Sequence, residues 1–207
     1  MSSKQVTAPI QRLCGHIDLF TFATLKTQRT QDALYAKNTL CKECHAAISK
    51  LAAPGKKGFY KMTFPEMKGP GNTKAFGNSI RIKSIRSLGP IMADLSNNES
   101  LYGQLALAVY TMLFQIDYAP FWINSRQFQF DTAWLVSEME NLIRTRPSSA
   151  VNQDQRSVFV YWTQVDRAKI RTARVALEEV AQHLDLSLAG RKETPISYET
   201  VAAPSCS

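Results

Sequence analysis

The chain has 207 residues, of which 44% are hydrophobic and 20% are charged, and its net charge is +8. This composition supports a folded core and excludes a wholly disordered chain. The N-terminal residues contain no apolar segment like that of a secretory signal, and polar residues interrupt the longest apolar region, 101–116, which argues against a membrane-spanning helix. We therefore expect a soluble cytoplasmic protein whose cysteines stay reduced.

The positive charge is concentrated in one third of the chain. Residues 25–88 contain thirteen Lys and Arg but only three Asp and Glu, which gives this region a net charge of +10. Such an asymmetry indicates an anionic partner, with nucleic acid as the first candidate. The alternative interpretation is an ordinary solvated surface that is rich in lysine.

Residues 1–52 are expected to form a small zinc-ribbon-like β/α module. The segment 17–24 is rich in β-branched and aromatic residues and predicts a short strand. A helical segment with Thr30 as its N-cap and Asn38 at its end should follow, and a second short helix should leave the cysteine pair that begins at Cys41. The module has too little apolar mass to fold unaided, so it needs a crosslink that its Cys and His residues can supply.

Residues 53–73 contain several Pro and Gly residues and predict a basic linker. Beyond them, residues 74–186 are expected to form a helical domain of about four helices, and residues 187–207 a flexible tail. In the first helix, Gly89 and Pro90 should introduce a kink or a split near Leu88.

The second helix should begin at a capping box of Ser96 and Glu99, and its regular apolar stripe places it at the centre of the core. Asp131 is the expected N-cap of the third helix. The last is predicted as one long helix from about residue 156 to 185, although VFVYW at 158–162 also has the composition of a strand. The predicted fold class is therefore mainly α, with the small N-terminal module in front.

Two short motifs, Cys14-x-His16 and Cys41-x-x-Cys44, have the spacing of a metal site. Each pair supplies two ligands from one turn, and the 24 residues between the pairs allow the two turns to meet, as in tetrahedral zinc sites. Three thiolates and one imidazole fill all four positions around Zn²⁺. The predicted site is therefore structural, and its binding energy contributes to folding the module.

Three other interpretations of the cysteine motifs exist. The run from Cys41 to His45 matches the CxxCH pattern of haem attachment, but that chemistry requires export and no signal peptide is visible. A redox CxxC normally opens a helix within a larger βαβ unit, which this sequence lacks. His45 is an alternative fourth ligand, although the glycine turn between Cys14 and His16 favours His16.

The nucleic-acid hypothesis depends on basic residues beside and beyond the cysteines. In the linker, lysines alternate with Phe59, Tyr60 and Phe64, a mixture that suits phosphate contact and base stacking. The alternative is that these rings pack onto the next domain. The candidate nucleic-acid-binding residues are Lys42, Lys56, Lys57, Lys61, Lys68, Arg81, Lys83 and Arg86.

The motifs CGH, CKEC, FPEMKG and FWINSR, in this order, resemble an uncharacterised zinc-ribbon family of bacterial mobile elements such as plasmids and phages. Two helical signatures of that family align with residues 76–81 and 121–126. Here Phe76, Gly77 and Phe121 replace the Trp, Ala and Trp of the family pattern. The resemblance implies a cytoplasmic accessory protein of a plasmid or phage and supplies no established reaction.

Trp122 and Arg126 are one helical turn apart, so the ring can hold the guanidinium against a phosphate or a partner carboxylate. Core packing is the alternative role for this pair. The sequence contains no P-loop, GxSxG, HExxH or dinucleotide motif, and we predict a protein that is not an enzyme. The leading hypothesis is nucleic-acid binding, and the alternative is a protein-interaction inhibitor of a host defence complex, of the anti-CRISPR or anti-restriction type.

Overall fold

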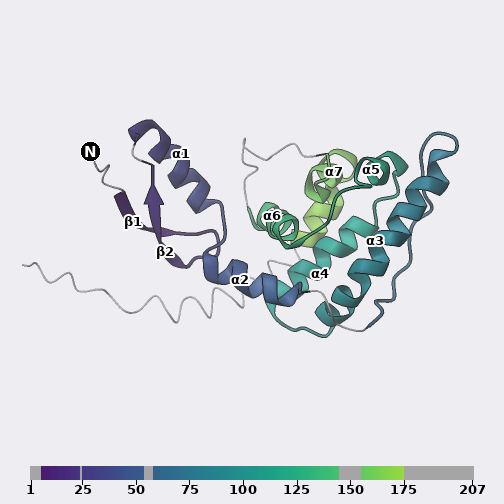
Figure 1. The fold of residues 1–207 in the computed structure, drawn as a ribbon, viewed down its shortest axis with the longest axis horizontal. Helices are drawn as coiled ribbons and strands as arrows, with labels where there is room; N and C mark the ends of the chain where they lie inside the picture. Colours follow the sequence, from purple (N-terminus) through teal and green to yellow (C-terminus); the bar gives the residue numbers. More distant parts are fainter. Residues whose placement is uncertain (1–5, 24, 54–57, 145–154, 175–207) are drawn as a thin grey trace, which may run out of the picture.

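The computed structural model of the protein describes residues 6–23, 25–53, 58–144 and 155–174. A two-stranded hairpin and one helix lie beside a larger helical body (Figure 1), so the prediction of a mainly α fold with a small N-terminal sheet is confirmed. The elements are β1 (Val6–Gln11), β2 (Ile17–Phe22), α1 (Lys26–Lys37), α2 (Lys42–Leu51), α3 (Thr73–Ser96), α4 (Leu101–Phe114), α5 (Ala119–Asn124), α6 (Thr132–Ile143) and α7 (Val158–Val165).

The N-terminal sheet is an antiparallel hairpin in which Gln11 lies opposite Ile17 and Val6 lies opposite Phe22. The strand predicted for 17–24 is confirmed as β2. Strand β1 was not predicted from the sequence. It contains Pro9, which is tolerated here because both strands of a two-stranded ribbon are edge strands. Helix α1 packs against both strands.

Helix α1 begins at Lys26, with Leu25 as its N-cap residue, so the predicted N-cap at Thr30 is wrong. Acidic Asp32 does not cap the helix but accepts a 2.8 Å hydrogen bond from the backbone N–H of Ala23, which ties α1 to the end of β2. The predicted end of the helix is confirmed, since Asn38 is its C-cap residue.

Helix α2 shares one hydrophobic core with the helical body, although sequence analysis assigned it to the N-terminal module. The side chain of Ile48 is fully buried, and Cys41 and Cys44 are nearly so. These residues belong to the same buried cluster as the core of α3, α4 and α6, and α2 contacts α4 and α6. The N-terminal region is therefore joined to the body through its second helix.

Helix α3 continues through Gly89 and Pro90, so of the kink or split predicted near Leu88, the split does not occur. A proline inside a helix removes one hydrogen bond and costs about 3 kcal/mol. Apolar burial on both sides of Pro90 offsets this cost, because Leu88 and Met92 are buried against the core. Tertiary packing here outweighs local propensity.

Because α3 extends to Ser96, the predicted capping box of Ser96 and Glu99 is wrong. The side chain of Ser100 caps α4 instead and accepts a 3.1 Å hydrogen bond from the backbone N–H of Gly103. The central position predicted for this helix is observed, since α4 contacts α2, α3, α6 and α7. Its core positions Leu105 and Leu113 are fully buried.

Asp131 caps α6 as predicted, with its Oδ1 accepting a 2.9 Å hydrogen bond from the backbone N–H of Trp134. The last predicted helix is interrupted: α7 ends at Val165, Asp166 is not helical, and residues 167–174 are helical again. The segment VFVYW is helical. The remainder of the predicted long helix and the predicted tail, 187–207, lie outside the described residues.

The described part of the predicted linker, residues 58–72, runs beside α3 in the opposite direction (Figure 1). At one end a Cβ on Gly58 would lie 2.8 Å from the Cβ of Ala93. Further along, the carbonyl of Pro65 accepts a 3.0 Å hydrogen bond from Arg81. This segment is therefore packed along the helix.

Across the described ranges, none of the helices has the combination of length and apolarity needed to cross a lipid bilayer.

Candidate metal centre and basic surface

The turn between β1 and β2 positions the first two candidate ligands, Cys14 and His16. It is closed by hydrogen bonds from the N–H of Arg12 to the carbonyl of His16, at 2.8 Å, and from the N–H of Gly15 to the carbonyl of Arg12, at 2.9 Å. Gly15 has a φ of 80°, a left-handed conformation that strains any residue with a Cβ. The glycine therefore allows a turn tight enough for both side chains to face the same point.

The N-terminus of α2 positions the other two candidate ligands. Cys41 is the N-cap residue, and its Sγ accepts a 3.4 Å hydrogen bond from the backbone N–H of Cys44. The unpaired N–H groups and the dipole of a helix N-terminus favour negative charge, which stabilises thiolates there. A 3.0 Å hydrogen bond from the N–H of Leu13 to the carbonyl of Thr39 holds the two turns together.

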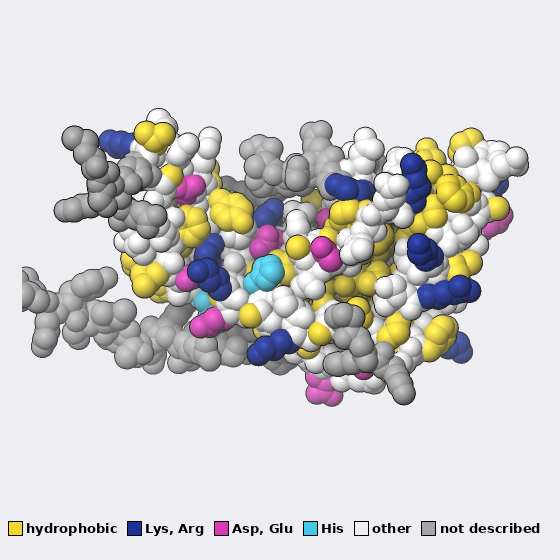
Figure 2. Space-filling view, in the orientation of Figure 1, with side chains coloured by type: hydrophobic (Ala, Val, Ile, Leu, Met, Phe, Trp, Pro, Cys, Tyr) yellow, Lys and Arg dark blue, Asp and Glu magenta, His cyan; other side chains and the backbone are white. Residues whose placement is uncertain are grey.

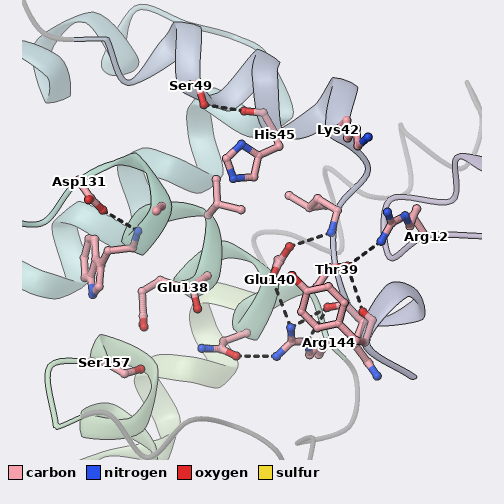
Figure 3. Close-up of a pocket in the computed structure, with 18 of the residues that line it drawn as sticks. Arg12, Thr39, Lys42, His45, Ser49, Asp131, Glu138, Glu140, Arg144 and Ser157 are labelled. Carbon is pink, nitrogen blue, oxygen red and sulfur yellow. Dashed lines mark hydrogen bonds and ion pairs between the residues drawn. The ribbon is translucent and has the colours of Figure 1, made fainter. Parts of the chain in front are cut away.

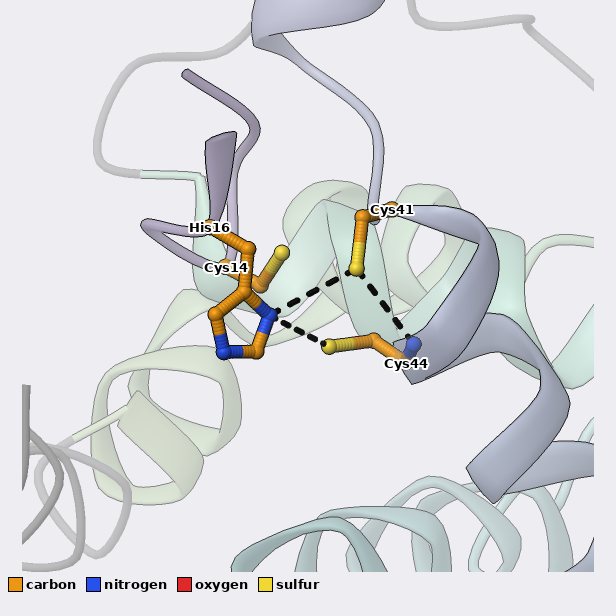
Figure 4. A group of neighbouring side chains, drawn as sticks. All are labelled: Cys14, His16, Cys41 and Cys44. Atoms are coloured by element: carbon orange, nitrogen blue, oxygen red, sulfur yellow. Dashed lines mark hydrogen bonds between the residues drawn. The ribbon is translucent and has the colours of Figure 1, made fainter. Parts of the chain in front are cut away.

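The structure brings all four predicted ligands into one cluster (Figure 4). Their ligand atoms lie within 4.8 Å of one another, and the His16 Nδ1 is 3.5 Å from the Cys41 Sγ and 3.2 Å from the Cys44 Sγ. A zinc tetrahedron with Zn–S of about 2.3 Å and Zn–N of about 2.0 Å has S–N edges of about 3.5 Å. The cysteines Cys14, Cys41 and Cys44 are not disulfide-bonded, so this cluster can hold a metal ion.

The protonation of the three thiols also indicates that a cation can bind between them. A hydrogen bond with Cys44 lowers the pKa of Cys14 to about 4, whereas the contact with Cys14, together with burial, raises the pKa of Cys44. Negative charge on one sulfur therefore opposes ionisation of its neighbour. A divalent cation among the sulfurs would favour the thiolate form of all three, as metal binding does at cysteine sites.

His45, the alternative fourth ligand, is exposed and lies outside the cluster. Its ring lies between α2 and α6 (Figure 3), at a groove of about 1690 Å³ that α1, α2 and α6 line. The two histidines thus differ because His16 follows the glycine turn, whereas His45 follows Cys44 on α2 and its side chain lines the groove.

Three residues of the helical body hold the segment around Cys41 in place, and none of them was predicted from the sequence. On α4, the Tyr102 hydroxyl donates a 2.9 Å hydrogen bond to the Cys44 Sγ. On α6, Glu140 accepts a 2.8 Å hydrogen bond from the N–H of Leu40. Arg144, the C-cap residue of α6, donates to the carbonyl of Asn38 at 2.9 and 2.6 Å (Figure 3). Burial raises the pKa of Glu140.

These contacts join residues that are 58, 100 and 106 positions apart, so no local pattern could have indicated them. A Tyr at the first turn of a helix or a Glu and an Arg four positions apart is common on any helix surface. The pairing depends on how α2 docks against α4 and α6, which is decided by tertiary packing.

The predicted nucleic-acid-binding residues are divided between two places. Lys42 is exposed on α2 and lines the groove beside His45. Lys61 and Lys68 are exposed on the segment along α3, and Lys83 and Arg86 are exposed on α3 itself. The predicted residues Lys56 and Lys57 lie outside the described residues.

We define the α3 basic face as the exposed α3 residues Phe76, Lys83 and Arg86; Lys61, which is exposed on the segment that runs along α3, is grouped with them by its charge. The three α3 residues follow one helical stripe, since they are spaced by seven and three positions, and the Phe76 side chain is 52% exposed. On the side of the molecule where α3 lies, Figure 2 shows Lys and Arg side chains interspersed with hydrophobic ones. Lys68 forms a 2.6 Å ion pair with Asp117.

Arg81 cannot belong to this face, and its predicted role in nucleic-acid binding is contradicted. Its side chain is on the inner side of α3 and is only 3% exposed. The guanidinium donates to the carbonyl of Pro65 at 3.0 Å and to the Oδ1 of Asn78 at 2.8 Å, and it lies over the ring of Phe64. Arg81 therefore attaches the segment 58–72 to α3.

The predicted partner-binding role of Trp122 is also contradicted, because this side chain is fully buried. Its indole Nε1 donates a 2.9 Å hydrogen bond to the carbonyl of Ile116, and its ring stacks on Phe114. Arg126 is exposed and donates to the carbonyl of Ile123 on α5. Core packing, the alternative considered for Trp122, is what the structure shows.

Two of the three aromatic rings of the predicted linker pack onto the helical domain, which was the alternative to base stacking. Phe64 contacts Phe114 of the core, with ring centroids 6.1 Å apart, and Tyr60 is half-buried. Phe59, by contrast, is 82% exposed.

Comparison of the chain with protein-family models, curated proteins and solved structures finds no match. The resemblance to the zinc-ribbon family of mobile elements therefore stays a prediction.

Proposed function

We propose that this protein is a non-enzymatic accessory protein of a mobile genetic element that holds a structural zinc ion and binds nucleic acid through the α3 basic face. The observation that carries the zinc assignment is the cluster of three sulfurs and one imidazole nitrogen within 4.8 Å. The exposed charge along α3 supports the second part of the proposal.

The donor set favours zinc and related metals over magnesium and calcium. Thiolate and imidazole ligands select zinc and related soft or borderline metals, whereas magnesium and calcium prefer oxygen. Four protein ligands leave no position for a substrate or an activated water, which is typical of a structural site. Zinc would supply a crosslink between the hairpin turn and the N-terminus of α2, and Cys14, His16, Cys41 and Cys44 would hold it.

The α3 basic face combines three cations with an exposed aromatic ring. Lys61, Lys83 and Arg86 can contact phosphates, and Phe76 offers a ring on which an unpaired base can stack. Because this face carries few cations, we expect modest affinity with a strong dependence on salt. If Z phosphates are neutralised, the slope of log K against log salt is about −0.9Z for duplex DNA, or about −3 for three contacts.

Metal analysis tests the zinc proposal first. We expect about one zinc per chain in protein purified without a metal-affinity tag, and its loss on chelation at low pH. A native preparation without zinc contradicts this part of the proposal.

A binding titration tests the nucleic-acid proposal. The triple variant Lys61→Gln, Lys83→Gln, Arg86→Gln should weaken binding to single-stranded and duplex DNA at low salt by at least tenfold and flatten the salt slope. The control Lys37→Gln removes an exposed cation from α1 and should leave binding unchanged. Equal binding of the triple variant and the wild-type protein, or no binding at low salt, refutes the proposal.

The alternative function, an inhibitor that binds a host defence complex, is favoured by a different observation. The outer side of β2 exposes apolar side chains, with Ile17 72% and Leu19 69% exposed, and exposed apolar surface is typical of protein interfaces. A stoichiometric protein partner that survives nuclease treatment in a pull-down would favour this function, and loss of all bound material on nuclease treatment would favour direct nucleic-acid binding.

A further inference from the structure

We propose that Tyr102 is a positioning residue of the metal site, whose hydrogen bond to Cys44 strengthens metal binding from the side of the helical body. This inference rests on the proposed zinc site. It adds to that proposal a fifth residue, from a helix that was predicted to belong to a different domain.

The geometry places the phenol directly on a ligand atom. The Tyr102 hydroxyl is 2.9 Å from the Cys44 Sγ, and the ring is half-buried against the core. An oxygen at this distance donates its proton to the sulfur, which is a stronger acceptor as a thiolate than as a thiol. The contact is therefore suited to the metal-bound form of Cys44.

The turn before α4 fixes the position of Tyr102. The side chain of Asn98 accepts a 2.9 Å hydrogen bond from the N–H of Ser100, whose own hydroxyl accepts from the N–H of Gly103 at 3.1 Å. A Cβ at Gly103 would lie 2.5 Å from the Asn98 Oδ1, so this turn is closely packed. Tyr102 lies between these capping residues and has little freedom to leave Cys44.

The net charge of the zinc-loaded site explains why the hydrogen bond from Tyr102 affects metal binding. Three thiolates, one neutral imidazole and Zn²⁺ have a net charge of −1, and the site is partly buried. Hydrogen bonds to the sulfurs compensate this charge. The backbone N–H of Cys44 donates a hydrogen bond to the Cys41 Sγ, and the Tyr102 hydroxyl donates one to the Cys44 Sγ.

The same segment is held from a second side by α6. Glu140 accepts from the N–H of Leu40, and Arg144 donates to the carbonyl of Asn38. The N-terminus of α2 is thus fixed to the body by α4 and α6, while the other two ligands come from the hairpin turn. A bound ion would connect the hairpin to a part of the chain that the body already holds.

The variant Tyr102→Phe tests the inference, with Tyr110→Phe as its control. Tyr110 is on the same helix and loses the same hydroxyl, but it is buried against Trp134. Competition with a chromophoric chelator should show about tenfold weaker zinc binding by Tyr102→Phe, the smaller of the usual effects of removing a partner of a metal ligand. Tyr110→Phe should bind zinc as the wild type does.

Cobalt spectra supply a readout that a general loss of stability would not change. In the Co²⁺-loaded full chain, we expect the thiolate-to-metal charge-transfer band to shift in Tyr102→Phe and to stay in place in Tyr110→Phe. Wild-type affinity and an unshifted band in Tyr102→Phe would overturn the inference while leaving the zinc proposal intact. A wild-type protein that binds neither zinc nor cobalt would overturn the zinc proposal itself.

Discussion

The hairpin with α1 and the helical body are stabilised by different means. In the body, Leu105, Leu113 and Trp122 are fully buried, and stacked or edge-on aromatic pairs connect α4, α5 and α6. In the hairpin region, large apolar side chains such as Ile17 and Leu19 are exposed. A region with so small a core must rely on polar contacts and, under the zinc proposal, on a metal crosslink, whereas the body can rely on apolar burial.

Removal of the metal is expected to have the largest effect and to act on the hairpin region alone. Structural zinc contributes about 10–16 kcal/mol of apparent binding energy in small zinc domains. After chelation, hydrogen exchange should show loss of protection in β1, β2 and α1 and retained protection in α4. Equal loss in both regions would mean that the body also depends on the metal, and no loss would mean that the hairpin is stable without it.

A cavity in the core of the body should destabilise the body and leave the metal site of the hairpin region intact. Leu113→Ala removes a fully buried side chain and should lower the free energy of unfolding by about 2–5 kcal/mol, measured by urea denaturation. The metal content of the folded protein should not change. The matched control Leu19→Ala removes the same atoms from a side chain that is 69% exposed and should cost less than about 0.5 kcal/mol.

Arg12 offers a sharper test of the polar contacts in the hairpin region. Its nearly buried guanidinium pairs with Asp18 at 3.0 Å and donates to Thr39 and to the carbonyl of Ala36. Arg12→Met keeps most of the bulk but leaves these acceptors unpaired, and we expect a loss of about 1–3 kcal/mol in thermal unfolding of the zinc-loaded protein.

The control for Arg12 is Arg126→Met, which removes an exposed arginine on the body and should change stability by less than about 0.5 kcal/mol. If the two arginine variants are equally stable, polar contacts do not distinguish the hairpin region.

Gly15→Ala is expected to have the smallest effect of the four changes. At a φ of 80°, an alanine costs about 1 kcal/mol relative to glycine, and the strain falls on the turn that carries Cys14 and His16. Zinc affinity in a chelator competition should fall by about fivefold, as expected for a cost of about 1 kcal/mol. A Gly71→Ala variant, also at positive φ but on the body side, should bind zinc normally.

The predictable part of the candidate site was its set of ligands. Cys14 and His16 share one turn, Cys41 and Cys44 share another, and the spacing within each pair is a local property that the sequence displays. The preference for His16 over His45 also came from a local feature, the intervening Gly15. Tyr102 and Glu140 could not be predicted, because their contacts with the metal-binding segment depend on helix docking.

The errors in the helical region have a common cause. Pro90 and Ser96 carry strong local signals for a break and for a cap, yet both lie within α3. Burial of the residues around Pro90 outweighs its local cost. Arg81 was assigned to a basic surface because its charge is visible in the sequence, whereas its orientation depends on which side of α3 meets the segment 58–72.

The sequence by itself determined the mainly α class, the strand predicted at 17–24, the set of candidate metal ligands and the concentration of positive charge, since each depends on composition or on short spacing. Tertiary structure alone decided that α2 belongs to the core of the body, that Arg81 and Trp122 are buried, and that Lys61 lies beside α3 while Lys42 lies at a separate groove. The physical reason is that burial and contact between distant segments depend on how apolar surfaces pack together, which no local pattern specifies.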